Sequence, residues 1–194
     1  MKKPLLIAVT GGIGSGKTEV INRLKNLGEK VISCDQITLQ LYSKRSVIKK
    51  LKVLFPQAVY GKFIKKIDKK IVANLVFNDS LKLKQLTDFL TPLVLETCLK
   101  QARRLRGRVF IEVPLLFECN AQDRFDKVIV VTRSLDSRIN GIVNRSNLTK
   151  EQAMARINSQ FNYDLADLSN YIVLQNDKDI SHLHTKVDYL LNII

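Results

Sequence analysis

The feature that most constrains this chain is a cluster of glycines near its amino end. Four glycines fall within six residues, in the run Gly11-Gly12-Ile13-Gly14-Ser15-Gly16-Lys17-Thr18. The apolar run Leu5 to Val9 precedes the cluster, and apolar residues at helical spacing, Val20, Leu24 and Leu27, follow it. The pattern therefore predicts a glycine-rich turn that leads from a buried strand into a helix.

The cluster also carries the residue types that bind phosphate. It satisfies the pattern GxxxxGK[ST], in which glycines let backbone N–H groups turn inward around an anion. The following helix would point its positive dipole end at that anion, Lys17 would add a full charge, and the Thr18 hydroxyl would be a Mg²⁺ ligand. We therefore predict a nucleotide site formed by Gly12, Ile13, Gly14, Ser15, Gly16, Lys17 and Thr18. The alternative is an ordinary glycine-rich turn with a surface lysine.

Short runs rich in Val and Ile alternate with helical patterns in most of the chain. These runs are Leu5 to Thr10, Lys30 to Ser33, Val109 to Val113, Val128 to Thr132 and Tyr171 to Leu174. They show no polar alternation, which is typical of parallel strands covered on both faces. The sequence therefore predicts an α/β fold.

The positive charge is concentrated in one third of the chain. The whole sequence has a net charge of +14, with 32 basic and 18 acidic residues. Lys44 to Arg106 holds 16 basic residues and four acidic ones, lacks strong strand candidates and shows helical spacing. Within it, Thr91 and Pro92 predict a break, with Thr91 capping and Pro92 opening a new helix. The excess charge predicts a polyanionic partner for an inserted helical region.

Several classes of protein are excluded by composition. Cys34, Cys98 and Cys119 form no CxxC pair, and the sequence has only two histidines, so neither a disulfide scaffold nor a zinc site is expected. No run of 18 apolar residues predicts a membrane span, so we expect a cytoplasmic protein. Aromatic residues are scarce and Trp is absent, which disfavours a nucleic-acid stacking surface.

Acidic residues follow or lie within two of the predicted strands. Asp35 comes just after Lys30 to Ser33, where the carboxyl ends of parallel strands gather around a ligand, so it is a candidate base; the alternative is a cap of the next helix. Glu112 is the only acid in a buried-looking run, which predicts a charge partner, and it could orient Mg²⁺ or the acceptor or make a structural hydrogen bond. Glu118 is expected to be a solvated or capping acid.

Arginines near a predicted helical hairpin could act on a bound nucleotide. Arg145 precedes Thr149 and Gln152, which have capping-box spacing for the next helix. A mobile hairpin with an inward arginine would form a lid that closes over ATP. A solvated surface arginine is the alternative for Arg145, and equally for Arg138 and Arg156.

Along essentially its whole length the sequence resembles the dephospho-coenzyme A kinases. The motifs that carry the resemblance are TGGIGSGK at 10–17, Val31-Ile32 leading to Asp35, Pro92, VPLLFE at 113–118, and Leu148 to Glu151 followed by Gln160. The resemblance implies a P-loop NTPase fold of three layers, with a five-stranded parallel sheet, a helical substrate-binding insertion and a lid. It implies one domain over 1–194, with a core of 1–42 and 107–194, an insertion at about 43–106 and a lid at about 138–162.

The implied reaction moves the γ-phosphate of ATP to the ribose 3′-hydroxyl of dephospho-CoA, the last step of coenzyme A biosynthesis. Carried over by motif, the catalytic residues are Lys17, Asp35 and Arg145, ATP and Mg²⁺ are the cofactors, and Thr18 is the metal ligand. The basic insertion would attract the pyrophosphate of dephospho-CoA. We expect a monomer or weak homo-oligomer, with no membrane or nucleic-acid partner.

The sequence departs from the family pattern at several of these positions. The first of two lid arginines is replaced by Gly141, and the acid after the second is Ser146. Arg138, three residues before Gly141, could reach the same space by helical geometry. Other departures are Ser33, Leu39, Lys69 and Thr91, of which Lys69 keeps the charge of an arginine without its planar fork.

Two other functions remain open from the sequence. One is a related P-loop kinase acting on another nucleotide-like or nucleoside hydroxyl, which would explain the altered residues. The other is a nucleotide-binding or nucleic-acid-binding protein without catalysis that uses its basic third as an adhesive surface.

Overall fold

The computed structural model describes residues 3–62, 64–77 and 79–194, which form two compact units. The first unit, here called the sheet unit, comprises the described residues up to Ile32 together with Ala102–Ile194. The second, here called the helical unit, is Ser33–Gln101. The assignment of residues 43–106 as a substrate-binding insertion stays a prediction.

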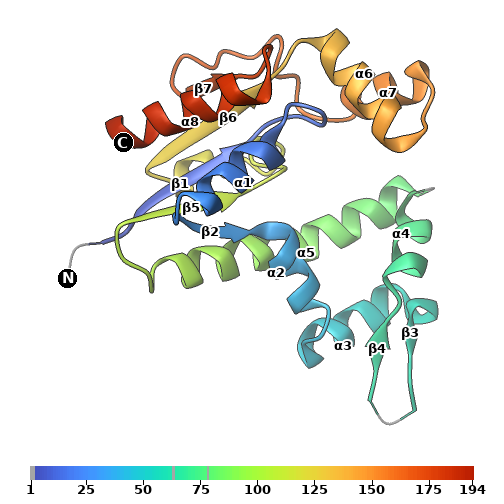
Figure 1. The fold of residues 1–194 in the computed structure, drawn as a ribbon. Coiled ribbons are helices and arrows are strands. Elements are labelled where there is room, and N and C mark those ends of the chain that lie inside the picture. The colour runs from blue at the N-terminus through green and yellow to red at the C-terminus, as the bar shows by residue number, and fades with distance from the viewer. Residues whose placement is uncertain (1–2, 63, 78) are drawn as a thin grey trace. The chain divides into compact units, whose positions relative to one another are not determined.

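The sheet unit is built on a five-stranded sheet in the order β2-β5-β1-β6-β7 (Figure 1). The strands are β1 (Leu5–Thr10), β2 (Lys30–Ser33), β5 (Arg108–Glu112), β6 (Lys127–Thr132) and β7 (Ile172–Gln175). Each lies within one residue of its predicted limits, and β1 pairs in parallel with both β5 and β6, as β6 does with β7. The predicted α/β fold with a parallel sheet is therefore confirmed.

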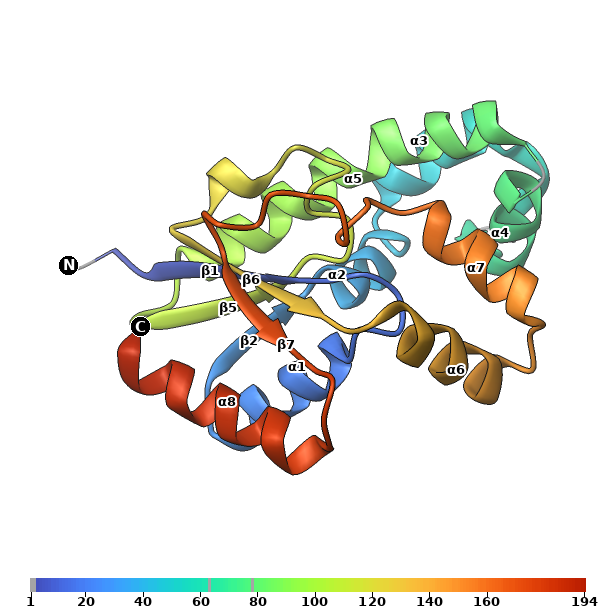
Figure 2. The same cartoon turned by 90° about the horizontal axis from the view of Figure 1, so that it is seen from above.

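The core of the sheet unit explains why its strands are continuously apolar. Val9, Phe110 and Ile129 in the three central strands are fully buried. On one face, α1 (Lys17–Asn26) and α8 (Ile180–Ile193) lie side by side (Figure 2), and Arg23 of α1 forms an ion pair with Asp188 of α8 at 2.5 Å. Strands buried in this way need no polar alternation.

A helical hairpin follows β6. It consists of α6 (Leu135–Ser146) and α7 (Lys150–Asn158), which share a small core of Ile139, Ile142, Ala153 and Ile157. The capping box predicted at Thr149 and Gln152 is confirmed, because each side chain bonds the backbone N–H of the other residue. A short 3₁₀ helix, Gln122–Arg124, precedes β6.

The helical unit contains elements that the sequence did not indicate. Its helices are α2 (Cys34–Leu41), α3 (Arg45–Leu54), α4 (Lys69–Phe77) and α5 (Ser80–Ala102), the last of which ends one residue beyond the unit. A 3₁₀ turn at Pro56–Ala58 leads into an antiparallel hairpin of β3 (Val59–Tyr60) and β4 (Lys66–Ile67). Strands of two residues are too short to show a periodic pattern.

The predicted break at Thr91 and Pro92 is wrong, because α5 runs through Pro92 without interruption. Proline in a helix interior removes the hydrogen bond to the carbonyl of residue i−4, here Asp88. Leu90 before the proline and Val94 and Leu95 after it are all buried. A single helix keeps these residues in one buried row, and this burial offsets the loss of one backbone hydrogen bond.

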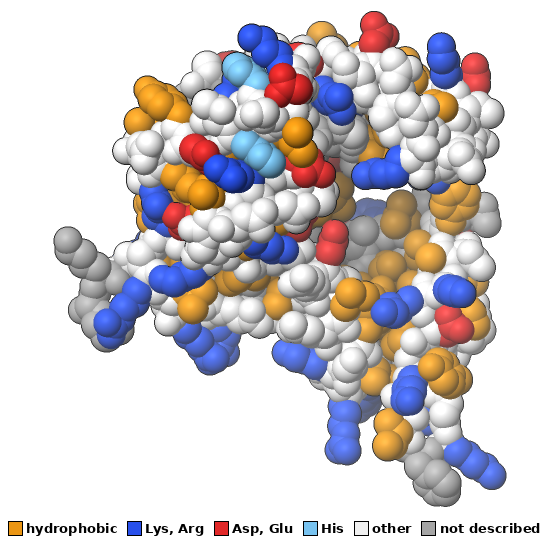
Figure 3. All heavy atoms as spheres, viewed as in Figure 1, with side chains coloured by type: hydrophobic (Ala, Val, Ile, Leu, Met, Phe, Trp, Pro, Cys, Tyr) orange, Lys and Arg blue, Asp and Glu red, His pale blue; other side chains and the backbone are white. Residues whose placement is uncertain are grey.

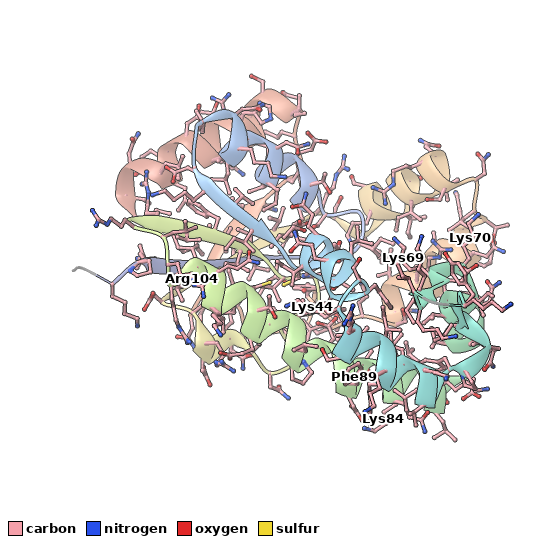
Figure 4. The ribbon with its side chains drawn as sticks, turned by 90° about the horizontal axis from the view of Figure 1, so that it is seen from below. Lys44, Lys69, Lys70, Lys84, Phe89 and Arg104 are labelled. Carbon is pink, nitrogen blue, oxygen red and sulfur yellow. The ribbon has the colours of Figure 1, made fainter. Side chains whose placement is uncertain are left out.

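Basic side chains cover much of the helical unit. On the face that Figure 3 shows, Lys and Arg recur over this unit while acidic side chains are few. Lys44 before α3, Lys69 and Lys70 at the start of α4, and Lys84 on α5 are all exposed (Figure 4). In the part of the chain that the structure describes, no helix combines the length and apolar character needed to cross a bilayer.

Candidate active site at the phosphate-binding loop

The glycine-rich loop joins the carboxyl end of β1 to α1 and is held by a residue from the far end of the chain. Gly16, the residue before α1, has a φ of 93°. A Cβ at this position would lie 2.1 Å from Nδ2 of Asn176, which donates a 2.9 Å hydrogen bond to the carbonyl of Ser15. Only glycine fits here, since both the positive φ and the close contact exclude a side chain. Asn176 follows β7, so the sheet itself positions the loop.

The loop lines an open cavity of about 360 Å³ within the sheet unit. All seven residues predicted to bind nucleotide, Gly12 to Thr18, line this cavity. The other lining residues are Gly11, Glu19, Pro114, Arg133, Gly141, Arg145, Gln160 and Asn176. The cavity lies at the amino end of α1, and its described lining includes three cations, Lys17, Arg133 and Arg145. Such a set binds an anion of several charges, as a polyphosphate has.

Lys17 has a carboxylate nearby. Its Nζ lies 3.8 Å from Oε1 of Glu112 at the end of β5, and both side chains are about 15% exposed. The predicted charge partner of Glu112 is therefore confirmed, and it is Lys17. Charge-assisted hydrogen bonds are about 2.7–2.9 Å long, so this pair holds the ammonium group nearby without a tight bond. Lys17 is left able to contact a phosphate.

The donor set fits a magnesium ion that arrives with a nucleotide. Thr18, whose hydroxyl is the predicted metal ligand, lines the cavity. Among the described residues, no group of three or more His, Cys, Asp or Glu could hold a metal ion by itself. Mg²⁺ is commonly bound through few protein oxygens together with substrate phosphates and water. Thr18 with phosphate oxygens is consistent with that arrangement.

The peptide of Ile13, in the middle of the loop, is held from both sides. Its N–H donates to Oε1 of Gln160 at 2.7 Å, and its carbonyl accepts from Nε of Arg138 at 3.1 Å. Arg138 is only 3% exposed and also contacts the Asp164 carboxylate at 3.3 Å. The expectation of a solvated Arg138 is therefore wrong. It is neither a solvated arginine nor among the residues lining the cavity; it is a buried support of the loop.

Glu118 and an aromatic cluster fix the segment that follows α7. Oε1 of Glu118 accepts a 3.0 Å hydrogen bond from the backbone N–H of Phe161, whose ring stacks on Phe117 with centroids 4.5 Å apart. Tyr163, in edge contact with both rings, bonds to the buried hydroxyl of Thr10 at 3.2 Å. Burial raises the pKa of Tyr163 to about 12. Glu118 thus caps a distant segment, and this segment carries Gln160 to the loop.

The three remaining arginines near the hairpin differ in position. Arg145, in the last turn of α6, is exposed and lines the cavity, as the lid hypothesis requires. Arg156 on α7 is exposed and is not among the lining residues. Arg133 lines the cavity and was missed by sequence reasoning. Its place directly after a predicted strand, as for Asp35, is a signal that could have found it.

Asp35 lies in the helical unit, in the first turn of α2, and its side chain is exposed. The residue at the N-cap of α2 is Ser33, so Asp35 is not the cap of this helix. An exposed carboxylate in a first turn is favoured by the helix dipole. The role of Asp35 as a base stays a prediction.

The comparisons with known proteins agree with one another. The family model for dephospho-CoA kinase matches residues 5–182. A dephospho-CoA kinase of Thermus thermophilus is 34% identical over 160 residues, which are 82% of this chain and 76% of the relative. One of Aromatoleum aromaticum is 33% identical over 188 residues, 95% of this chain and 91% of the relative.

Solved structures resemble the chain over its full length. The crystal structure of TT1252 from Thermus thermophilus has a TM-score of 0.81 and 31% identity, covering 100% of this chain and 99% of the other. The dephospho-CoA kinase from Campylobacter jejuni has a TM-score of 0.71 and 27% identity, covering 96% and 95%. Because the family model spans nearly the whole chain and the fold agrees with it, the chain belongs to the dephospho-CoA kinase family.

Proposed function

We propose that this protein transfers the γ-phosphate of ATP to the ribose 3′-hydroxyl of dephospho-CoA, which yields coenzyme A and ADP. The observation that carries the proposal is the cavity at the glycine-rich loop, where Lys17, Thr18 and Arg145 come together in a member of this family. Phosphoryl transfer needs the phosphates to be held in position and surrounded by positive charge, and the residues that line the cavity supply both.

The loop and its cations hold the nucleotide. The backbone N–H groups of Gly14 and Gly16 and the amino end of α1 bind the phosphates, because the N–H groups of Ile13 and Ser15 already donate to Gln160 and Gly12. Lys17 neutralises the charge on the β- and γ-phosphates. Mg²⁺ bound by Thr18 and phosphate oxygens would neutralise the charge that develops on those oxygens. Arg145 stabilises the transferring group, because a cation there acts on charge that grows in the transition state.

The acceptor hydroxyl is activated by Asp35. As the new bond forms between the 3′-oxygen and the γ-phosphorus, the bond from that phosphorus to the β-bridging oxygen breaks and ADP leaves. The hydroxyl proton passes to the carboxylate of Asp35. Because Asp35 acts on the acceptor hydroxyl and not on the nucleotide, it contributes to the chemical step and not to ATP binding.

Two regions are assigned to substrate capture and closure. The basic residues of 43–106 attract the pyrophosphate of dephospho-CoA by long-range electrostatics. The hairpin of α6 and α7, which overlaps most of the predicted lid at 138–162, closes over ATP and excludes water. The expectations of a cytoplasmic enzyme that acts as a monomer or weak homo-oligomer stay predictions.

A coupled assay with purified protein tests the proposal. We expect ADP release from Mg·ATP that depends on dephospho-CoA, and a product phosphorylated at the 3′-hydroxyl. ADP release with only a different nucleoside or nucleotide acceptor would replace this substrate with another one. Salt-sensitive RNA binding without turnover would contradict the enzymatic function.

A further inference from the structure

Arg133 lines the nucleotide cavity, and no sequence motif assigns it a role there. It follows Thr132, the last residue of β6, so the carboxyl end of a central strand carries it into the lining of the nucleotide cavity. Its Nε is buried and has no hydrogen-bond acceptor among the described residues. A buried guanidinium nitrogen without an acceptor is costly unless a ligand or water pairs with it.

The nearby acid does not account for Arg133. Asp177 accepts a 2.7 Å hydrogen bond from the backbone N–H of Ser134. This hydrogen bond is the main reason why the pKa of Asp177 lies below its ordinary value, and the positive charge of Arg133 contributes least. The carboxylate of Asp177 thus bonds to the backbone of Ser134, and Arg133 acts on it as a nearby charge.

Gly141 on α6 lies next to the guanidinium of Arg133. A Cβ built on Gly141 would have a single neighbour within 4 Å among the described residues beyond its own helix, NH1 of Arg133 at 3.8 Å. Gly141 and Arg133 both line the nucleotide cavity, as does Arg145 one helical turn further along α6. A side chain at position 141 would therefore begin in van der Waals contact with the guanidinium of Arg133, and a long one would extend into the same part of the cavity.

We propose that Arg133 is a catalytic residue that binds the terminal phosphates of ATP and forms, with Arg145, the pair of guanidinium groups around the transferring group. This inference rests on the proposed function. Arg133 reaches the phosphates from the end of a strand, across the gap that Gly141 leaves, whereas Arg145 reaches them from a helix. Arg138 does not share this role, since its guanidinium holds Ile13 and Asp164.

Calorimetric titration of Mg·ATP into Arg133→Gln and Arg156→Gln variants tests this assignment. Arg156 is the matched control because it is an exposed arginine on α7 of the hairpin that follows Arg133, and it is not among the cavity-lining residues. We expect ATP affinity to fall by at least about tenfold in Arg133→Gln and by less than about twofold in Arg156→Gln. In turnover assays kcat should fall by about 100-fold in the first variant only.

A second variant separates a phosphate contact from a structural role. Gly141→Arg added to Arg133→Gln returns a guanidinium to the same volume, so we expect it to restore most of the lost ATP affinity. The melting temperature without nucleotide should be no lower in Arg133→Gln than in wild type, because the buried Nε of Arg133 has no acceptor in the absence of a ligand. Equal ATP affinities in Arg133→Gln and Arg156→Gln, a lowered melting temperature, or no rescue by Gly141→Arg would each overturn the assignment.

The titration also keeps this inference distinct from the proposed function. If the wild-type protein binds Mg·ATP but does not phosphorylate dephospho-CoA, the proposed acceptor is wrong while the comparison of variants still tests Arg133. If dephospho-CoA is phosphorylated and Arg133→Gln behaves as wild type, the function stands and Arg133 has no part in it.

Discussion

The sheet unit and the helical unit present their functional side chains in different ways. In the sheet unit, Ile13 is held by Gln160 and Arg138, and Ser15 by Asn176. In the helical unit, residues 33–101 include 13 basic and five acidic residues, and its basic side chains are mostly exposed. Lys84 and Asp88 form an ion pair of 2.7 Å between neighbouring turns of α5. A site made by contacts binds one ligand in one geometry, whereas an exposed charged surface acts mainly through its field.

Replacing Lys17 by Ala should have the largest effect. The change removes the ammonium group from the nucleotide cavity, and we expect turnover to fall by at least about 10³-fold. Lys25→Ala, on the exposed side of the same helix, is the control and should keep wild-type kcat. Measurable turnover within tenfold of wild type in Lys17→Ala would contradict the role of the loop.

Replacing Asp35 by Asn tests whether the helical unit also holds a residue with a specific role. The amide cannot accept the hydroxyl proton, so kcat should fall by about 100-fold while ATP affinity stays unchanged. Asp88→Asn, which removes an exposed carboxylate in the same unit, should change kcat by less than twofold. A near-normal kcat in Asp35→Asn would remove Asp35 as the base.

Gln160→Ala measures how much the loop depends on its supporting contacts. The Ile13 N–H loses its acceptor, and a hydrogen bond of about 1 kcal/mol corresponds to a loss of about fivefold to tenfold in ATP affinity. The affinity for dephospho-CoA should not change. Gln85→Ala, at an exposed position of α5, is the control in the same titration. Equal ATP affinities in both variants would show that the loop is rigid without Gln160.

Removal of lysine pairs tests the long-range field of the helical unit and should have the smallest effect. Lys69→Gln with Lys70→Gln, and Lys49→Gln with Lys50→Gln, change the charge equally at two sites. If the field acts as a whole, both double variants lower kcat/KM for dephospho-CoA by about twofold to threefold at low salt, and the loss vanishes at high salt. A salt-independent loss confined to the Lys69 and Lys70 variant would instead indicate a direct contact.

The sheet unit could be predicted from the sequence more completely than the helical unit. The central strands β1, β5 and β6 were located within one residue because a strand buried on both faces must be apolar throughout, and the partly exposed edge strands β2 and β7 were located from similar short apolar runs. The loop residues from Gly12 to Thr18 were found because phosphate binding by a backbone requires glycine at set positions. The β3–β4 hairpin left no periodic signal, and the helix through Pro92 contradicts local preference because burial of Leu90, Val94 and Leu95 outweighs it.

The sequence by itself determined the parallel sheet, the loop, the capping box at Thr149 and a partner for Glu112, since each depends on local residue types or on a buried charge. Only the tertiary structure decided the roles of the arginines. Whether an arginine faces a ligand depends on which distant groups surround it. Arg138 is occupied by the Ile13 carbonyl and Asp164, while Arg133 lines the cavity beside Gly141, and its Nε has no acceptor among the residues that the structure describes. These neighbours are separated by up to 125 positions in the chain, and no local pattern records them.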